Sequence, residues 1–200
     1  DICYKGQNIL DIPEKEKRNI RGAEIGMIFQ DAGASLCPIR TIGEQIYESI
    51  RAHKKVTRAE AKEQAMELFE KLNFKDSERV WDSYPFELSG GMNQRAGIAI
   101  AMLMNPPILF ADEPTSALDV AVQRQVVNEM LHLRDLFGTA IVIVTHDIGV
   151  VSAMADTVLV LKNGEVQEYG AAREILENPQ KPYTKKLLAA VPKLQRGERI

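Results

Sequence analysis

Residues 108–114 read ILFADEP, and this stretch decides the fold class. An apolar run, ILFA, is followed directly by Asp112 and Glu113. A short continuous apolar run is typical of a buried parallel strand, and α/β sheets bind their ligands at the carboxyl ends of such strands. The stretch therefore predicts a strand that carries two carboxylates to a ligand-binding edge. The plain alternative is that two adjacent carboxylates on a loop are simply solvated.

Two further stretches predict buried strands before and after this one. EIGMIF (24–29) runs into Gln30, and TAIVIVTH (139–146) ends at His146. Between the second and third strands, VAVQRQVVNEMLHLRDLF (120–137) has the pattern of a helix. Strands that alternate with helices predict an α/β fold with a mostly parallel sheet. Because parallel strands end at the same edge, the polar residues that end them are expected to meet there.

The rest of the chain gives shorter predicted elements and a domain organisation. These elements are a strand at 2–10, a helix at 13–20 opened by Pro13 at its first position, a loop at 31–38, helices within 41–74 with a Thr57–Glu60 capping box, a helix at 92–104, helical residues 147–155, and a hairpin at 157–170 with an Asn163–Gly164 turn. We expect residues 1–40 and 88–200 to form a core and residues 41–87 to be an all-helical insertion.

The composition is that of one ordinary globular domain, or of a domain with a small subdomain. The 200 residues are 45% hydrophobic, and 25 basic residues against 28 acidic ones give a net charge of −3. This balance gives no reason to expect a nucleic-acid partner. Cys3 and Cys37 do not have metal-ligand spacing, which favours a reducing, cytosolic setting. The longest apolar run, 96–104, is far shorter than the ~20 residues that span a bilayer.

The stretch ELSGGMNQR (87–95) predicts a place for an anion. Ser89 can cap a helix, while Gly90 and Gly91 allow backbone N–H groups to approach a ligand closely. The start of a helix adds partial positive charge. The plain alternative is a serine-capped helix with a glycine-rich turn. The sequence contains no G-x-x-x-x-G-K-[ST] loop, the usual cradle for nucleotide phosphates.

Each strand end also fits a role in phosphoryl transfer. An aspartate such as Asp112 helps to hold Mg²⁺ in sites of this type, and Glu113 is placed to orient or deprotonate the attacking water. His146 could contact a γ-phosphate or help to orient that water, and the amide of Gln30 could reach Mg²⁺ or water. Taken alone, His146 is equally a structural residue at a strand end, and Gln30 a loop residue that faces solvent.

Taken in order, these motifs resemble the ATP-binding subunits of ABC transporters. The resemblance rests on Gln30 (the Q-loop of that family), LSGGMNQ (the signature motif), ILFADEP (Walker B), SALD at 116–119 (the D-loop) and THD at 145–147 (the H-loop). It covers essentially the whole chain. It implies an α/β, P-loop NTPase-like (ABC ATPase) fold with a mostly parallel sheet and an inserted helical subdomain, and it implies ATP and Mg²⁺ as cofactors.

The resemblance also implies residue roles. In the family, two subunits sandwich two ATP molecules, and the signature helix of one subunit caps the γ-phosphate held by the other. The implied set is Glu113 as general base, His146 as transition-state stabiliser, Gln30 as γ-phosphate sensor and metal contact, Asp112 as Mg²⁺ ligand, and Ser89, Gly90, Gly91, Gln94 and Asp119 as residues that serve the neighbour's nucleotide or the dimer interface.

Finer features resemble the importers of dipeptides, oligopeptides and nickel. These features are IRGAEIGMIFQD, EPTSALDVAVQRQV and NPQKPYTKKLLAAVP (178–192). The group implies a second ATPase subunit, transmembrane permeases, an indirect extracytoplasmic binding protein, and a location at the inner face of the cell membrane. Two departures stand out. QDAGASLCP replaces the group's common QDPMTSLNP in the loop that by analogy lies near the membrane partner, and Met92 replaces the signature glutamine.

Because the phosphate loop lies upstream in this family, we expect the sequence to be the C-terminal part of a longer subunit, with its N-terminal part truncated. As an isolated chain it should bind MgATP weakly or not at all. Two other functions stay open from the residues: a soluble ATPase of chromosome maintenance or translation, and a non-catalytic interaction module. The single head and the short helical insertion argue against the first, and the Asp112–Glu113 pair with His146 argues against the second.

Overall fold

The computed structural model describes residues 1–116 and 118–190 of the chain. It divides the chain into two compact units, one from Asp1 to Val144 and one from Thr145 onward. These two units differ from the predicted division of the chain into a core and a helical insertion at 41–87. The predicted division stays a prediction. Each unit is described by itself below.

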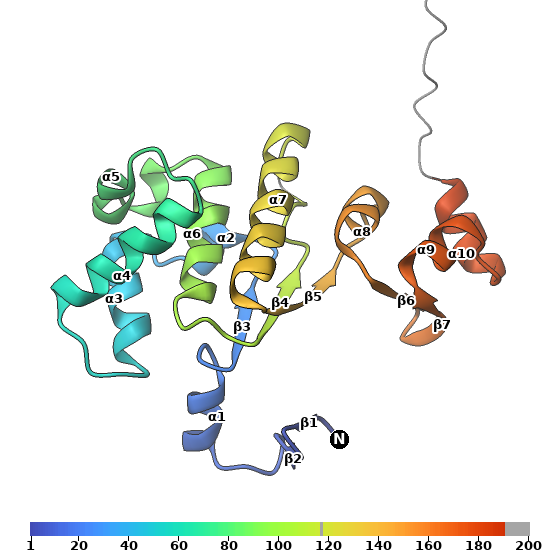
Figure 1. The fold of residues 1–200 in the computed structure, drawn as a ribbon, viewed down its shortest axis with the longest axis horizontal. Coiled ribbons are helices and arrows are strands. Elements are labelled where there is room, and N and C mark those ends of the chain that lie inside the picture. The colour runs from blue at the N-terminus through green and yellow to red at the C-terminus, as the bar shows by residue number, and fades with distance from the viewer. Residues whose placement is uncertain (117, 191–200) are drawn as a thin grey trace, which may run out of the picture. The chain divides into compact units, whose positions relative to one another are not determined.

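A parallel sheet forms the centre of the first unit. Its strands are β3 (Ile25–Ile28), β4 (Ile108–Asp112) and β5 (Ala140–Val144), in the order β3-β4-β5 (Figure 1). All the pairings between them are parallel. The α/β class with a parallel sheet is therefore confirmed, and β4 has the bounds that ILFAD predicts.

The sheet is buried on one face of these strands and exposed on the other. Helix α6 (Gly90–Met102) covers the first face so closely that a Cβ atom added to Gly26 would lie 2.7 Å from the Ala101 carbonyl oxygen. On the other face, one row of the register joins Met27, Phe110 and Val142, and these side chains are 47%, 40% and 46% exposed. The prediction of buried strands therefore holds for the face that carries Gly26, whereas the face that carries Phe110 is exposed in the described residues.

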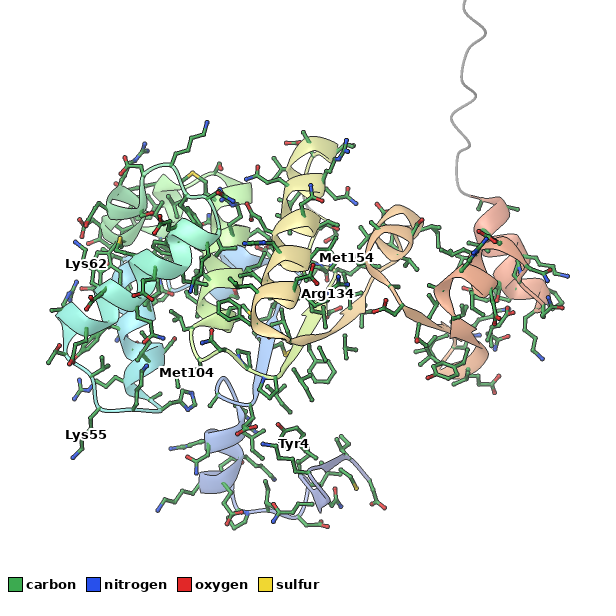
Figure 2. The ribbon with its side chains drawn as sticks, in the orientation of Figure 1. Tyr4, Lys55, Lys62, Met104, Arg134 and Met154 are labelled. Carbon is green, nitrogen blue, oxygen red and sulfur yellow. The ribbon has the colours of Figure 1, made fainter. Side chains whose placement is uncertain are left out.

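Three helices that follow β3 in the sequence pack on one another. They are α3 (Ile42–Arg51), α4 (Arg58–Lys71) and α5 (Ser77–Asp82), followed by the 3₁₀ turn η1 (Pro85–Glu87). The predicted Thr57–Glu60 capping box is present at the start of α4, and α3 begins with a second one. At the surface, Lys62 of α4 (Figure 2) pairs with Glu78 of α5. Phe69 and Trp81 fill the interior.

The N-terminal segment differs from the predicted single strand at 2–10. It folds back as two short antiparallel strands, β1 (Cys3–Tyr4) and β2 (Gln7–Asn8). The reason is local, because Lys5 and Gly6 both have positive φ, +47° and +80°, which is the geometry of a tight hairpin turn. The hydroxyl of Tyr4, labelled in Figure 2, donates a hydrogen bond to the Glu24 carboxylate (2.7 Å).

Two short helices also refine the prediction. Helix α1 (Glu14–Ile20) starts after Pro13, which is its N-cap rather than its first helical residue. Helix α2 (Ala32–Ser35) lies in the stretch predicted as a loop. It forms because the Asp31 carboxylate accepts a hydrogen bond from the Ala34 backbone N–H (2.9 Å), the usual way in which aspartate starts a helical turn.

The long helix of the first unit agrees with its prediction. Helix α7 (Val120–Phe137) has the expected bounds, and Gly138 ends it with a φ of +66°. A left-handed residue of this kind is a common helix stop, and glycine adopts it at no steric cost.

The second unit contains a hairpin with helices around it. Helix α8 (Ile148–Met154) is followed by the antiparallel strands β6 (Thr157–Lys162) and β7 (Glu165–Ala171), then by α9 (Ala172–Glu177) and α10 (Pro182–Ala189). The predicted Asn163–Gly164 turn is confirmed, since both residues have positive φ, +52° and +79°.

Candidate functional site

The carboxyl end of β4 carries the two predicted acidic residues. Asp112 is the last residue of the strand and is exposed, and Glu113 follows it half-buried. Glu113 has a φ of +45°, a left-handed conformation that costs a residue with a side chain on the order of 1–3 kcal/mol and clusters at functional sites. The backbone N–H of Glu113 donates to the Val144 carbonyl oxygen (2.8 Å), and the Glu113 carbonyl oxygen accepts a hydrogen bond from the Ser116 hydroxyl (3.1 Å). These bonds fix the direction in which Glu113 leaves the strand.

Gln30 lies at the same edge of the sheet. The register pairs Ile28 with Ala111, so Gln30, two residues beyond β3, emerges beside the end of β4. Gln30 is exposed. The structure therefore brings Gln30 to the edge that holds Asp112 and Glu113, as the sequence predicts.

His146 follows β5, the strand on the other side of β4. The last pair of that register joins Asp112 to Val144, two residues before His146. His146 is exposed and belongs to the second unit. Its role at this edge stays a prediction.

The start of α6 has the predicted serine cap. The Ser89 hydroxyl oxygen accepts a hydrogen bond from the Met92 backbone N–H (3.3 Å). The two glycines that follow have different surroundings. A Cβ atom on Gly90 would meet nothing within 4 Å in the described chain, whereas one on Gly91 would lie 2.6 Å from Cγ1 of Val122. Gly91 is therefore needed for packing within the chain, and Gly90 leaves open space in front of the helix.

Asp119 is the N-cap of α7, whose first turn lies beside the start of α6. Its carboxylate accepts hydrogen bonds from the backbone N–H groups of Ala121 and Val122, both at 3.0 Å. Because Val122 also contacts Gly91, the starts of α6 and α7 lie side by side. The SALD motif includes Ala117, which lies outside the described residues, so only its remaining positions are placed.

Gln94 differs from the other predicted ligand residues. It is 4% exposed, inside α6, and its side-chain nitrogen has no hydrogen-bond partner among the described residues. The Gln94 side chain is therefore not at the surface of this chain, where it could contact a nucleotide. Its predicted role stays a prediction.

The most heavily bonded residue of the signature stretch is one to which the sequence analysis gave no role. Arg95 is 9% exposed, and its guanidinium pairs with the Glu129 carboxylate of α7 at 2.8 Å. It also donates to the carbonyl oxygen of Leu72, at the end of α4, and lies 4.2 Å from the Phe74 ring centre. Arg95 thus joins three helices. The available signal was its place in a helix whose other residues are mostly small or apolar, since a buried arginine needs a partner.

The oxygen atoms at the sheet edge suit a hard cation. Mg²⁺ prefers oxygen ligands and usually takes one or two from protein side chains, with waters and phosphate oxygens completing the shell. Asp112 and Gln30 fit such a partial set. Within residues 1–116 and 118–190 there is no cluster of three or more histidine, cysteine or acidic side chains arranged to hold a metal ion alone.

Comparison with known families places this chain. The model of the ABC transporter family matches residues 1–116, and that of the oligopeptide/dipeptide transporter C-terminal region matches residues 167–200. The chain belongs to the ABC transporter family.

Curated relatives point to one branch of that family. The chain is 43% identical over 197 residues to a probable peptide ABC transporter ATP-binding protein, y4tR, of Sinorhizobium fredii, covering 98% of this chain and 59% of that protein. It is 47% identical over 193 residues to the dipeptide transport ATP-binding protein DppD of Lactococcus lactis, covering 96% and 55%. It is 44% identical over 195 residues to the oligopeptide transport ATP-binding protein OppD of Bacillus subtilis, covering 98% and 54%. The chain therefore spans little more than half the length of these relatives.

Solved structures agree with the family assignment. A dimeric, post-hydrolysis state of the ATP-binding cassette MJ0796 with ADP and Pi superposes with a TM-score of 0.73 at 31% identity, covering 85% of this chain and 72% of that one. A second dimeric structure of that cassette gives a TM-score of 0.71 at 32% identity, covering 82% and 70%. In the described part of the chain, no helix combines the length and the apolar character needed to cross a bilayer.

Proposed function

We propose that this chain is part of an ATP-hydrolysing subunit that energises the uptake of peptides through separate transmembrane permeases. The observation that carries this proposal is the sheet edge where Glu113 is held in a left-handed conformation directly after Asp112, beside Gln30. The relatives described above are named as peptide transporters, so peptides rather than nickel are the proposed cargo.

The chemistry follows from the oxygen and nitrogen atoms at that edge. Asp112 and Gln30 would hold Mg²⁺, which supplies charge neutralisation for the phosphates. Glu113 would accept the proton of the attacking water, because it directly follows Asp112 at the edge where Mg²⁺ would be held. His146 would stabilise the negative charge that develops on the γ-phosphate.

The start of α6 would serve a second protomer. Ser89, Gly90 and Gly91 would present backbone N–H groups and the positive end of the helix to the γ-phosphate of the partner's ATP. The open space at Gly90 supports this proposal, since a ligand can approach there without meeting this chain. Asp119 would lie at the same interface, because Val122 links its helix to Gly91. The dimeric relatives of known structure favour such a pair.

The membrane partners would meet the loop after Gln30. Ile39 in that loop is 82% exposed, an unusual position for an apolar side chain with nothing to cover it in the described chain. We place the subunit in the cytoplasm, peripheral to the inner face of the membrane, with an extracytoplasmic binding protein acting through the permeases.

The test is Glu113→Gln in the full-length subunit assembled with its permeases. This change keeps the shape of the side chain and removes the base, so ATP turnover should fall at least ~10²-fold. ATP-dependent dimers should accumulate in gel filtration. Glu63→Gln, at an exposed position of α4, is the matched control and should leave turnover unchanged. Turnover by Glu113→Gln equal to that of the wild type would exclude Glu113 as the base.

The cargo has its own test. Cells that carry the transporter with wild-type subunit should accumulate labelled di- or oligopeptides, and the Glu113→Gln cells should not. Active ATP turnover without peptide uptake would keep the ATPase and overturn the proposed substrate class.

A further inference from the structure

The loop that begins at Gln30 is anchored along its first half. Asp31 starts helix α2, with its carboxylate accepting from the Ala34 N–H (2.9 Å) and its carbonyl oxygen accepting from the Ser35 N–H (3.0 Å). Leu36, which follows, is 6% exposed. Residues 31–36 therefore form one short helical turn that follows β3 and ends at a buried leucine.

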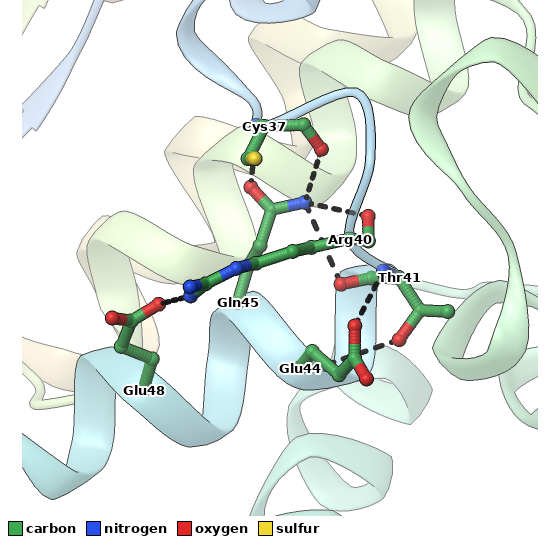
Figure 3. Close-up of polar contacts among 6 residues, drawn as sticks. All are labelled: Cys37, Arg40, Thr41, Glu44, Gln45 and Glu48. Atoms are coloured by element: carbon green, nitrogen blue, oxygen red, sulfur yellow. Dashed lines mark hydrogen bonds and ion pairs between the residues drawn. The ribbon is translucent and has the colours of Figure 1, made fainter.

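The second half of the loop is held by one side chain, Gln45 of α3 (Figure 3). Its oxygen accepts a hydrogen bond from the Cys37 backbone N–H (2.8 Å). Its nitrogen donates to the carbonyl oxygens of Cys37 (3.2 Å) and Arg40 (3.1 Å), and Thr41 lies at the limit of this range (3.5 Å). A single amide thus satisfies backbone groups at both ends of the 37–41 segment.

Gln45 stands on a well-fixed helix. A capping box of Thr41 and Glu44 closes the start of α3, and Ile42 and Ile46 on the same helix are fully buried. Gln45 itself is half-buried. Because packing fixes the backbone of α3, only the rotamer freedom of the Gln45 side chain is lost when it binds the loop, and its several hydrogen bonds offset that cost.

A second contact between loop and helix is weaker. Arg40 pairs with Glu48 one turn further along α3, but their side chains are 49% and 66% exposed. Exposed ion pairs contribute little because water screens them. The amide of Gln45 is therefore the main polar tie between this loop and α3.

We propose that Gln45 is a positioning residue that makes the loop beginning at Gln30 move together with α3. The inference rests on the proposed ATPase function, because it gives Gln30 its task at the phosphate edge. The connection runs from Gln45 to Cys37, through the helical turn at residues 31–36, and back to Gln30. Without Gln45, segment 37–41 loses its side-chain tie to α3, and the loop from Gln30 is no longer held to that helix by an amide.

Hydrogen exchange tests the tie without reference to activity. In the full-length subunit, Gln45→Leu should speed exchange of the Cys37 and Arg40 amides by about tenfold or more, because the Cys37 N–H loses its acceptor. Gln64→Leu is the matched control. Gln64 is also a half-buried glutamine of the neighbouring helix, and its amide also donates to a backbone carbonyl oxygen, that of Leu103. Unchanged exchange at Cys37 in Gln45→Leu would overturn the proposal.

Kinetics test whether the tie acts through Gln30. In the complete transporter, Gln45→Leu should lower kcat about tenfold and leave the KM for ATP within about twofold. Gln30→Ala should do the same, and the double variant should lose no more than either alone, because both changes remove one function. Gln64→Leu should keep wild-type kcat. Additive losses, or wild-type kcat in Gln45→Leu, would overturn the positioning role.

Two further outcomes, an inactive wild-type transporter and a Gln45→Leu variant that does not fold, are also distinguished by these experiments. If the wild-type transporter does not hydrolyse ATP, the proposed function fails, whereas the exchange experiment still decides the tie. If Gln45→Leu does not fold, Gln45→Glu takes its place. Its carboxylate still accepts from the Cys37 N–H but cannot donate to the carbonyl oxygens of Cys37, Arg40 and Thr41. The turn in which the Arg40 N–H donates to the Cys37 carbonyl oxygen is then held less firmly, so the Arg40 amide should exchange faster and kcat should fall. Wild-type values for both would overturn the proposal.

Discussion

Removing Arg95 should destabilise the chain far more than most single substitutions. Arg95→Leu leaves the Glu129 carboxylate, whose side chain is 8% exposed, without its guanidinium partner. Breaking a buried ion pair in this way costs about 3–5 kcal/mol. Gln125 still donates to Glu129 (3.0 Å) and keeps the cost within that range. Typical domains have only about 5–15 kcal/mol of stability in total.

The double variant Arg95→Leu/Glu129→Leu separates the ion pair from the other contacts of Arg95. It removes the stranded charge as well, so the remaining cost is that of the Leu72 carbonyl oxygen, which loses one donor, about 1–3 kcal/mol. Urea denaturation of the chain at neutral pH, followed by circular dichroism, measures both. Both variants lose the bond to Leu72, so the double variant should be the more stable of the two by the ion-pair term alone, about 3–5 kcal/mol. A double variant as unstable as Arg95→Leu would refute the reasoning.

Three further outcomes are expected. Gly90→Ala should leave the chain as stable or slightly more stable, whereas Gly91→Ala should cost about 1–3 kcal/mol in urea denaturation because its methyl group meets Val122; equal effects would contradict the packing. The backbone N–H and the hydroxyl of Thr57 hold the pKa of Glu60 below its ordinary value. This capping contribution is therefore complete at neutral pH and is lost as the pH falls below about 4.3 and through the lower folded-state pKa. Thr57→Val keeps the backbone N–H and removes only the hydroxyl, so NMR titration should show a partial rise of that pKa, and no rise would exclude the hydroxyl as a cause. Finally, the isolated 200-residue chain should bind MgATP weakly or not at all in calorimetry, because its sequence has no G-x-x-x-x-G-K-[ST] loop; micromolar binding would refute this.

The apolar runs of the sequence located the strands well but not their surroundings. ILFAD predicted β4 to the residue, and the βαβ order predicted its parallel neighbours. The same runs were interpreted as buried strands, whereas Phe110 and Val142 on one face are exposed. An apolar run indicates that a strand can be buried, but it does not indicate which face of the sheet the helices of the described chain cover.

Short helices and turns were predicted where their chemistry is local. The Asn163–Gly164 turn and the Thr57–Glu60 box follow from neighbouring residues and were found as expected. The turn at Lys5–Gly6 was missed because an alternating stretch was interpreted as one strand, although glycine was there to permit positive φ. Helix α2 was missed because its start depends on one aspartate side chain.

The sequence by itself determined that carboxylates stand at the end of a parallel strand, that a serine and two glycines open a helix, and where most helices stop. These features are set by residues a few positions apart in the sequence, which are therefore also neighbours in the structure. Only the tertiary structure decided that Arg95 joins Glu129, 34 residues away, that Val122 fills the space beside Gly91, and that Gln45 holds the loop after Gln30. Such contacts join residues that are far apart in the sequence and become neighbours only when the helices pack, so no local sequence pattern predicts them.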